Sequence, residues 1–133
     1  MMIKPDAVAR SLVGRILARV EESGLRVIGL RMVHLQAAEA RAFYRVHEGK
    51  PFVDALVAFM SSGPIVVGVL EGEDAIRRWR DLMGATDPAR AASGTIRKDF
   101  AENIERNSVH GSDAPETARE EIAFYALSVG LRG

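Results

Sequence analysis

The 133-residue sequence contains no cysteine, which excludes disulfides, thiol catalysis and cysteine-bound zinc. It has no excess charge of either sign, because 18 Lys and Arg residues balance 18 Asp and Glu residues. Nucleic-acid-binding domains usually carry a strongly basic surface, so this balance disfavours that class. No apolar run approaches the roughly 20 residues of a membrane span, and the first residues lack the apolar stretch of a signal peptide. We therefore expect a soluble cytoplasmic protein.

The common phosphate-binding signatures are also absent. The sequence has no Walker A motif and no glycine-rich dinucleotide fingerprint. The histidines His34 and His47 form no recognisable metal-ligand pair with His110. His34 is predicted near a strand end, and His47 in an exposed polar stretch. If the protein handles a nucleoside triphosphate, it does so without the usual phosphate-binding loop.

The sequence does contain alternating helical and extended segments with no linker or repeat, typical of a single domain across residues 1–133. Strands are predicted before Lys4, at 25–35 with a bend at Gly29, and at 107–109. A further strand at 65–70 is a continuous apolar run, which indicates a buried central position. Helices are predicted at 12–23, 38–46, 51–60, 74–83 and 113–127. This order predicts an α+β sandwich whose mainly antiparallel sheet carries helices on one side.

His110 is the most informative residue of the chain. It lies in residues 107–113, Asn-Ser-Val-His-Gly-Ser-Asp, where small and polar side chains leave room for a charged substrate. An imidazole is nucleophilic at neutral pH and can carry a phosphoryl group as a covalent intermediate. Such a histidine needs other residues that orient its ring and neutralise its substrate.

The predicted helix at 74–83 carries one charged residue on its apolar face. Arg80 falls at helical spacing with Ile76, Trp79 and Met83. An unpaired charge away from water is very costly, so a buried guanidinium needs a partner. Arg80 is therefore predicted either to form a salt bridge at the edge of the core or to reach into a cleft and bind an anion.

The last predicted helix repeats this pattern with a carboxylate. Glu121 lies on its inner face with Ala118, Ile122 and Tyr125. A turn after His110 allows this carboxylate to lie beside the imidazole. A carboxylate that accepts from one ring nitrogen fixes the tautomer and leaves the other nitrogen free to attack. The alternative is an ion pair between Glu121 and a basic residue.

Further cationic and hydroxyl side chains lie outside the long helices. Lys4 is near the N-terminus, Thr86 is in a predicted loop at 85–94, and Arg97 follows that loop. Taken alone, Arg97 is predicted to be a solvated surface charge and Thr86 a turn residue. Together with Arg80 they provide the components of a phosphate pocket, because guanidinium groups match phosphate oxygens and lysine acts as a point charge.

Five segments of the sequence resemble motifs of the nucleoside diphosphate kinases, in the bacterial form of that family. In chain order they are Ile-Lys-Pro-Asp-Ala-Val (3–8), Ser-Gly-Pro (62–64), Met-Gly-Ala-Thr-Asp-Pro (83–88), Gly-Thr-Ile-Arg (94–97) and Asn-Ser-Val-His-Gly-Ser-Asp (107–113). The resemblance implies a ferredoxin-like βαββαβ core. It also implies transfer of the γ-phosphoryl group from ATP or another nucleoside triphosphate to a nucleoside diphosphate.

The resemblance further implies roles for individual residues. In a ping-pong reaction His110 is phosphorylated, Glu121 holds its ring, Lys4 is a catalytic cation and Ser112 is a hydroxyl beside the histidine. The base stacks on Phe52. The other positions that match nucleotide contacts of the family are Lys4, Tyr44, Leu56, Arg80, Thr86, Arg97, Ile104 and Asn107. Mg²⁺ is expected to be held mainly by nucleotide phosphates and water, with no assigned protein ligand. The family implies a homo-oligomer, either a tetramer or a hexamer.

The sequence departs from the family pattern in three places. Only three residues precede Lys4, so the first strand is expected to be truncated and the support under Lys4 loosened. Glu105 stands where the family usually has glycine, and a requirement for positive φ there would strain it. Residues 126–133 carry no clear family signature.

These departures and the composition define two alternatives to an active kinase. The first is an inactive or destabilised family member that keeps the motifs but lacks most of the first strand. The second is a nucleic-acid-binding module, which zero net charge and few aromatic residues disfavour.

Overall fold

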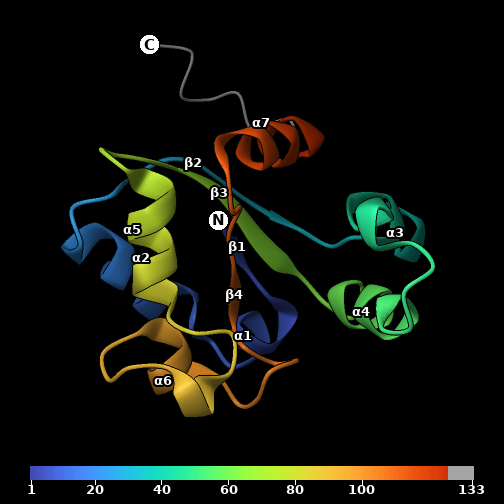
Figure 1. The fold of residues 1–133 in the computed structure, drawn as a ribbon, viewed down its shortest axis with the longest axis horizontal. Helices are drawn as coiled ribbons and strands as arrows, with labels where there is room; N and C mark the ends of the chain where they lie inside the picture. Colours follow the sequence, from blue (N-terminus) through green and yellow to red (C-terminus); the bar gives the residue numbers. More distant parts are fainter. Residues whose placement is uncertain (126–133) are drawn as a thin grey trace.

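The computed structural model describes residues 1–125, and a four-stranded sheet lies at its centre (Figure 1). The strands are β1 (Met2–Ile3), β2 (Arg26–Val33), β3 (Ile65–Glu71) and β4 (Val109–His110). Their order in the sheet is β2-β3-β1-β4, and each neighbouring pair is antiparallel. This arrangement agrees with the predicted ferredoxin-like α+β sandwich.

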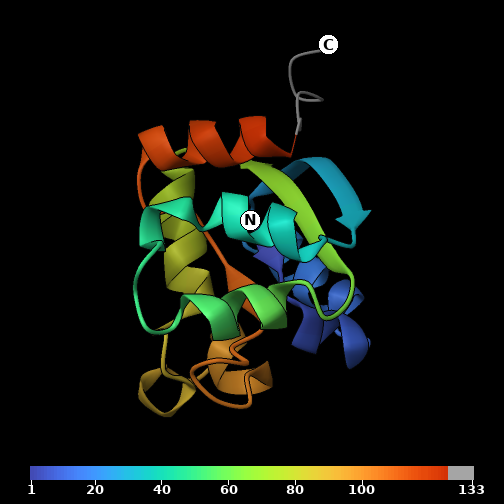
Figure 2. The same cartoon turned by 90° about the vertical axis from the view of Figure 1, so that its right-hand side faces the viewer.

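Helices cover both faces of the sheet, so the expectation of helices on one side is wrong. In Figure 1, α2 and α5 lie on one side of the sheet, and α3 and α4 lie on the other. Figure 2 shows α7 lying across the top of the face that α3 and α4 cover. The helices of residues 1–125 are α1 (Pro5–Ala9), α2 (Val13–Glu22), α3 (Ala37–Phe43), α4 (Val53–Met60), α5 (Ala75–Met83), α6 (Ile96–Phe100) and α7 (Pro115–Phe124), with short 3-10 turns η1 (Arg45–His47) and η2 (Pro88–Arg90). None of these helices is long and apolar enough to cross a membrane.

Strand β3 shows why both faces need cover. Ile65 and Val67 pack into the core that α3, α4 and α7 share with the sheet, whereas Val66 and Leu70 pack into the core on the side of α2 and α5. A strand that is apolar on both faces must be buried on both. The continuous apolar run predicts this burial correctly, and the burial requires helices on either side.

Most predicted elements lie within a few residues of their expected ends. A register shift between Val27 and Gly29 in β2 confirms the bend expected there. Helices α1 and α6 are not predicted, because five-residue helices are too short to show helical periodicity. The predicted helix at 113–127 is α7, whose described part begins at Pro115; residues 126 and 127 lie outside the described residues.

Strand β1 is short, as expected, and it lies between β3 and β4. Met2 pairs with Val67 on one side and with His110 on the other. Met1 continues the pairing, because its nitrogen donates to the carbonyl of Gly68 at 2.8 Å. The two-residue strand therefore joins β4, which carries His110, to the centre of the sheet.

Candidate active site around His110

A strained turn leads into the strand that carries His110. Ser108 is buried and has a φ of 75°, and the N–H of Val109 donates to the carbonyl of Asn107 at 2.9 Å, which closes a γ-turn. Non-glycine residues rarely adopt this conformation, which costs on the order of 1–3 kcal/mol and occurs most often at functional sites. Glu105 is not among the residues with positive φ, so the condition under which it would be strained is not met.

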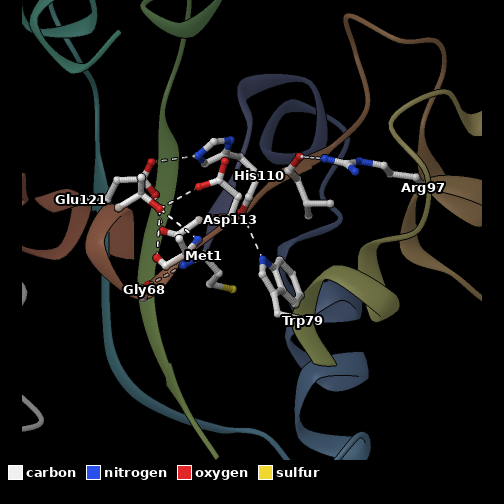
Figure 3. Close-up of polar contacts among 11 residues, drawn as sticks. Met1, Gly68, Trp79, Arg97, His110, Asp113 and Glu121 are labelled. Atoms are coloured by element: carbon white, nitrogen blue, oxygen red, sulfur yellow. Dashed lines mark hydrogen bonds and ion pairs between the residues drawn. The ribbon is translucent and has the colours of Figure 1, made fainter. Parts of the chain in front are cut away.

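The His110 ring faces a carboxylate, as the helix pattern predicts. Its Nε2 lies 3.3 Å from Oε2 of Glu121 on α7, and Ser112 donates from its hydroxyl to the other carboxylate oxygen (Figure 3). Burial raises the pKa of Glu121, but the hydrogen bonds from His110 and Ser112 outweigh it, so the pKa is lowered overall. Glu121 is therefore an ionised acceptor that directs the Nε2–H toward itself and leaves Nδ1 with the lone pair.

Two side chains, from helices α5 and α6, hold the backbone of β4 in place. Trp79 on α5 donates from its indole nitrogen to the carbonyl of His110 at 3.2 Å, and Arg97 on α6 donates to the carbonyl of Val109 at 3.0 Å (Figure 3). A Cβ on Gly111 would lie 2.4 Å from the indole ring, so only glycine fits beneath Trp79. The sequence does not assign Trp79 a role, and its position one residue before Arg80 gives no signal of this contact.

Arg97 is buried, so its expected position as a solvated surface charge is wrong. Its guanidinium also donates to the carbonyl of Gly84 at 2.9 Å and thereby connects the loop after α5 to β4. Burial, together with the nearby charge of Arg80, lowers the pKa of Arg97 to about 10. Carbonyl acceptors that are distant in sequence explain why a charged residue is buried here.

Arg80 is exposed, so its expected place on the buried face of α5 is wrong. Trp79 and Met83 fill that face, and consecutive residues of a helix point about 100° apart. Arg80 pairs with no carboxylate among residues 1–125. The alternative in which Glu121 pairs with a basic residue such as Arg80 is therefore not the one observed, and the charge of Arg80 acts instead on nearby Arg97.

Lys4 connects to Thr86 through Asn107. Its ammonium donates to the Asn107 side-chain oxygen at 2.8 Å, and the Asn107 amide donates to the Thr86 carbonyl at 3.2 Å. Burial lowers the pKa of Lys4 to about 8, with Asp6 opposing and Arg97 assisting this shift. The backbone N–H of Lys4 also donates to the carbonyl of Ser108 at 2.9 Å, so Lys4 is tied to the γ-turn despite the short β1.

The aromatic side of the site lies along α3 and α4. Phe52, just before α4, is 44% exposed, and Leu56 follows it by one helical turn and is half-buried. Tyr44 ends α3 as a buried residue, and burial raises the pKa of its hydroxyl. His47 is half-buried rather than exposed, and its ring lies 5.4 Å from that of Phe52. This side of the site therefore offers an accessible aromatic face.

The structure brings the predicted residues together to different degrees. His110, Glu121 and Ser112 form one connected group, and Lys4, Asn107 and Thr86 form a second. Phe52 and Ile104 are large apolar side chains that remain exposed, at 44% and 55%. No group of three His, Asp or Glu side chains in the described part of the chain has the geometry to hold a metal ion.

Comparison with known proteins identifies this combination. The family model for nucleoside diphosphate kinase matches residues 1–128. The chain is 60% identical to the nucleoside diphosphate kinase of Halorhodospira halophila over 124 residues, which are 93% of this chain and 88% of that one. The enzyme of Nitrosospira multiformis matches to the same extent. The chain belongs to the nucleoside diphosphate kinase family. The family's phosphotransfer is therefore its activity, and neither alternative finds support.

Solved structures agree with this assignment. The nucleoside diphosphate kinase of Aquifex aeolicus superposes with a TM-score of 0.90 at 42% identity, over 93% of this chain and 90% of that one. The enzyme of Halobacterium salinarum, solved in complex with CDP, superposes with a TM-score of 0.89 at 44% identity, over 93% of this chain and 83% of that one. These matches confirm the predicted ferredoxin-like fold.

Proposed function

We propose that the γ-phosphoryl group passes through Nδ1 of His110. In the first half-reaction Nδ1 attacks the γ-phosphorus, the N–P bond forms, and the bond to the β–γ bridging oxygen breaks to release a nucleoside diphosphate. In the second half-reaction a β-phosphate oxygen of the acceptor diphosphate attacks the same phosphorus and breaks the N–P bond. The observation that supports this route is the contact between Nε2 and Glu121, which leaves Nδ1 as the free nitrogen.

Three cations are proposed to neutralise the nucleotide phosphates. Lys4, Arg80 and Arg97 come from different elements, and mutual repulsion between the two arginines favours an anion between them. Phosphoryl transfer depends mainly on positioning and on neutralising charge at the nonbridging oxygens. Arg97 already donates to two backbone carbonyls. The same side chain is therefore proposed both to support β4 and to bring positive charge to the phosphates.

The nucleoside is proposed to lie against the aromatic side of the site. Stacking on Phe52 tolerates any base, because every base has a π-face, and Leu56 and Ile104 are proposed to pack near the base. The remaining polar contacts to the nucleotide are proposed to come from Tyr44, Thr86 and Asn107. Ser112 is proposed as the hydroxyl beside His110. The relative from Halobacterium salinarum that was solved with CDP supports nucleotide binding in this fold.

Mg²⁺ is proposed to bind through the nucleotide. Glu121 is engaged by His110 and Ser112, so it is not free to serve as a metal ligand. A Mg²⁺ ion dehydrates reluctantly and is commonly held by phosphate oxygens and water. The ion would be held by nucleotide oxygens and water, and it would supply positive charge that offsets the negative charge of the phosphates.

Assembly as a homo-oligomer, either a tetramer or a hexamer, is also proposed. Strand β2 lies at the edge of the sheet, and its Leu30 and Met32 are 46% and 57% exposed. Exposed apolar side chains on an edge strand favour pairing with another chain. The cytoplasmic location expected from the sequence stays a prediction.

A labelling experiment tests the phosphohistidine. Incubation with γ-³²P-ATP is expected to label the protein with an alkali-stable, acid-labile adduct, and His110→Ala is expected to abolish the label. His34→Ala is the matched control, because His34 is an exposed histidine whose ring contacts the carbonyl of Ser61. Equal labelling of His110→Ala and the unsubstituted protein would refute the proposal.

A further inference from the structure

The Phe59 ring on α4 lies beside two cations. The ammonium nitrogen of Lys4 is 5.9 Å from the ring centroid, and the guanidinium carbon of Arg106 is 5.6 Å from it. Both distances fall within the roughly 6 Å range over which an aromatic face attracts a cation. Phe59 follows Phe52 by two helical turns along α4. The helix that begins beside the exposed Phe52 ring therefore also carries the ring that contacts Lys4.

The surroundings of Lys4 compensate its charge only in part. Asn107 offers a neutral acceptor, while Arg97 from α6 repels the ammonium. Asp6 from α1 is the favourable charge, but burial raises the pKa of that carboxyl, and Ser108 donates to it at 3.4 Å. The ammonium therefore has an opposing cation, a neutral acceptor and one buried carboxyl as its polar neighbours.

An aromatic face has a property that none of these neighbours has. It attracts a cation through the ring quadrupole without accepting an N–H along a lone pair. Of the three N–H donors on the Lys4 ammonium, one is directed to Asn107. A cation held partly by a ring keeps its other donors for phosphate oxygens.

We propose that Phe59 is a positioning residue, whose ring holds the Lys4 ammonium beside Asn107 and favours its charged form. The proposal rests on the proposed function in one respect, namely that Lys4 binds nucleotide phosphate. The guanidinium of Arg106 lies against the same ring, so the Phe59 π-face attracts two cations at once.

Titration of Lys4 by NMR tests the proposal without any substrate. The lysines of the chain are Lys4, Lys50 and Lys98, so a ¹³C,¹⁵N-lysine-labelled sample gives few signals to assign. Burial holds the pKa of Lys4 near 8, and Phe59→Leu is expected to lower it further by roughly half to one pH unit, the size of a partly desolvated cation–π contact. Phe59→Tyr keeps a π-face and is expected to retain the original titration.

Phe100→Leu is the matched control. Phe100 on α6 is also half-buried, and the guanidinium of Arg19 lies 4.8 Å from its ring centroid. This change removes the cation–π contact of Arg19, which does not involve Lys4. The pKa of Lys4 is therefore expected to stay within about 0.2 pH unit of its value in the unsubstituted protein. If Phe59→Leu leaves the Lys4 titration unchanged, or if Phe59→Tyr shifts it equally, the proposal is wrong.

Two further measurements complete the test. In the unsubstituted protein the ε-methylene protons of Lys4 are expected to show upfield ring-current shifts and nuclear Overhauser effects to Phe59; their absence overturns the proposal even if Phe59→Leu does not fold. In the kinase assay the alkaline limb of kcat/KM is expected to move to lower pH in Phe59→Leu by the same interval. If Phe59→Leu shifts the Lys4 titration but leaves the pH profile of kcat/KM unchanged, Phe59 does position Lys4, but Lys4 does not bind the nucleotide phosphates.

Discussion

Replacing Glu121 with glutamine removes the negative charge that lies 3.3 Å from Nε2 of His110 and keeps a side chain of the same shape. The proposed phosphorylation at Nδ1 would leave the ring cationic, with a proton on Nε2 that the carboxylate stabilises. The amide oxygen of glutamine still accepts from that N–H, but without charge. The phosphorylation step is therefore expected to slow, whereas nucleotide binding, which involves other residues, is expected to change little.

The size of the effect follows from the geometry. Two unit charges 3.3 Å apart interact by about 5 kcal/mol at an effective dielectric constant of about 20. The side chains of His110 and Glu121 are 30% and 28% exposed, so solvent screening reduces this value, and charged hydrogen bonds contribute a net ~1.5–3 kcal/mol. A loss of about 2 kcal/mol corresponds to a roughly 30-fold slower phosphorylation step.

Rapid-quench measurement of a single turnover with labelled ATP gives the rate of that step directly. Glu120→Gln is the matched control, because it makes the same chemical change at the neighbouring, exposed position of α7. A Glu121→Gln rate within twofold of the unsubstituted protein, at unchanged nucleotide affinity, would show that the carboxylate does not orient or stabilise the phosphorylated ring.

The same substitution has a defined effect on stability. The pKa of Glu121 is lowered from its ordinary value of 4.5, so its ionised form contributes stability that is present above that value and is lost as the pH falls through the lowered pKa. The unsubstituted protein is therefore expected to exceed Glu121→Gln in thermal stability at neutral pH. The difference is expected to shrink below pH 4.5, and a difference that is independent of pH would contradict this account.

Two further substitutions separate support of the backbone from binding of the base. Gly111→Ala places a Cβ about 2.4 Å from the indole of Trp79, so unfolding experiments should show a loss on the order of 1–3 kcal/mol; an unchanged melting temperature would contradict the close contact. Phe52→Ala removes an exposed ring, so steady-state assays should show a rise in KM of about tenfold, from a stacking contribution of ~1–3 kcal/mol, with little change in kcat. An unchanged KM for purine and pyrimidine nucleotides alike would exclude stacking on Phe52.

Helical periodicity predicts the position of Glu121 but not that of Arg80, although the same reasoning applies to both. In α7 the small Ala118 lies one turn before Glu121 on the inner face, and the carboxylate of Glu121 fits there beside His110. In α5 the large side chains of Trp79 and Met83 occupy the face that packs on the sheet. Periodicity gives the direction of a side chain around the helix axis, whereas the width of the buried stripe depends on the residues that fill it.

The burial of Arg97 shows a second limit of sequence reasoning. Its partners are the backbone carbonyls of Gly84 and Val109, and carbonyls carry no signature in the sequence. The same holds for Trp79, whose indole donates to the carbonyl of His110. The motifs therefore predict which charged side chains are expected near the phosphates. They do not predict which of these charges are buried, because burial depends on backbone carbonyls that only the fold brings close to them.

The backbone and the ring of His110 are contacted by different elements of the fold. Met2 in β1 pairs with His110 in the sheet, Trp79 donates to its carbonyl, and Glu121 binds its ring. The γ-turn at Ser108 comes just before, and such strain persists only where surrounding contacts outweigh it. Backbone and ring are thus held by different elements. It follows that the ring could change charge on the proposed phosphorylation while the strand beneath it stays fixed, which is the preorganisation that the proposed transfer through Nδ1 requires.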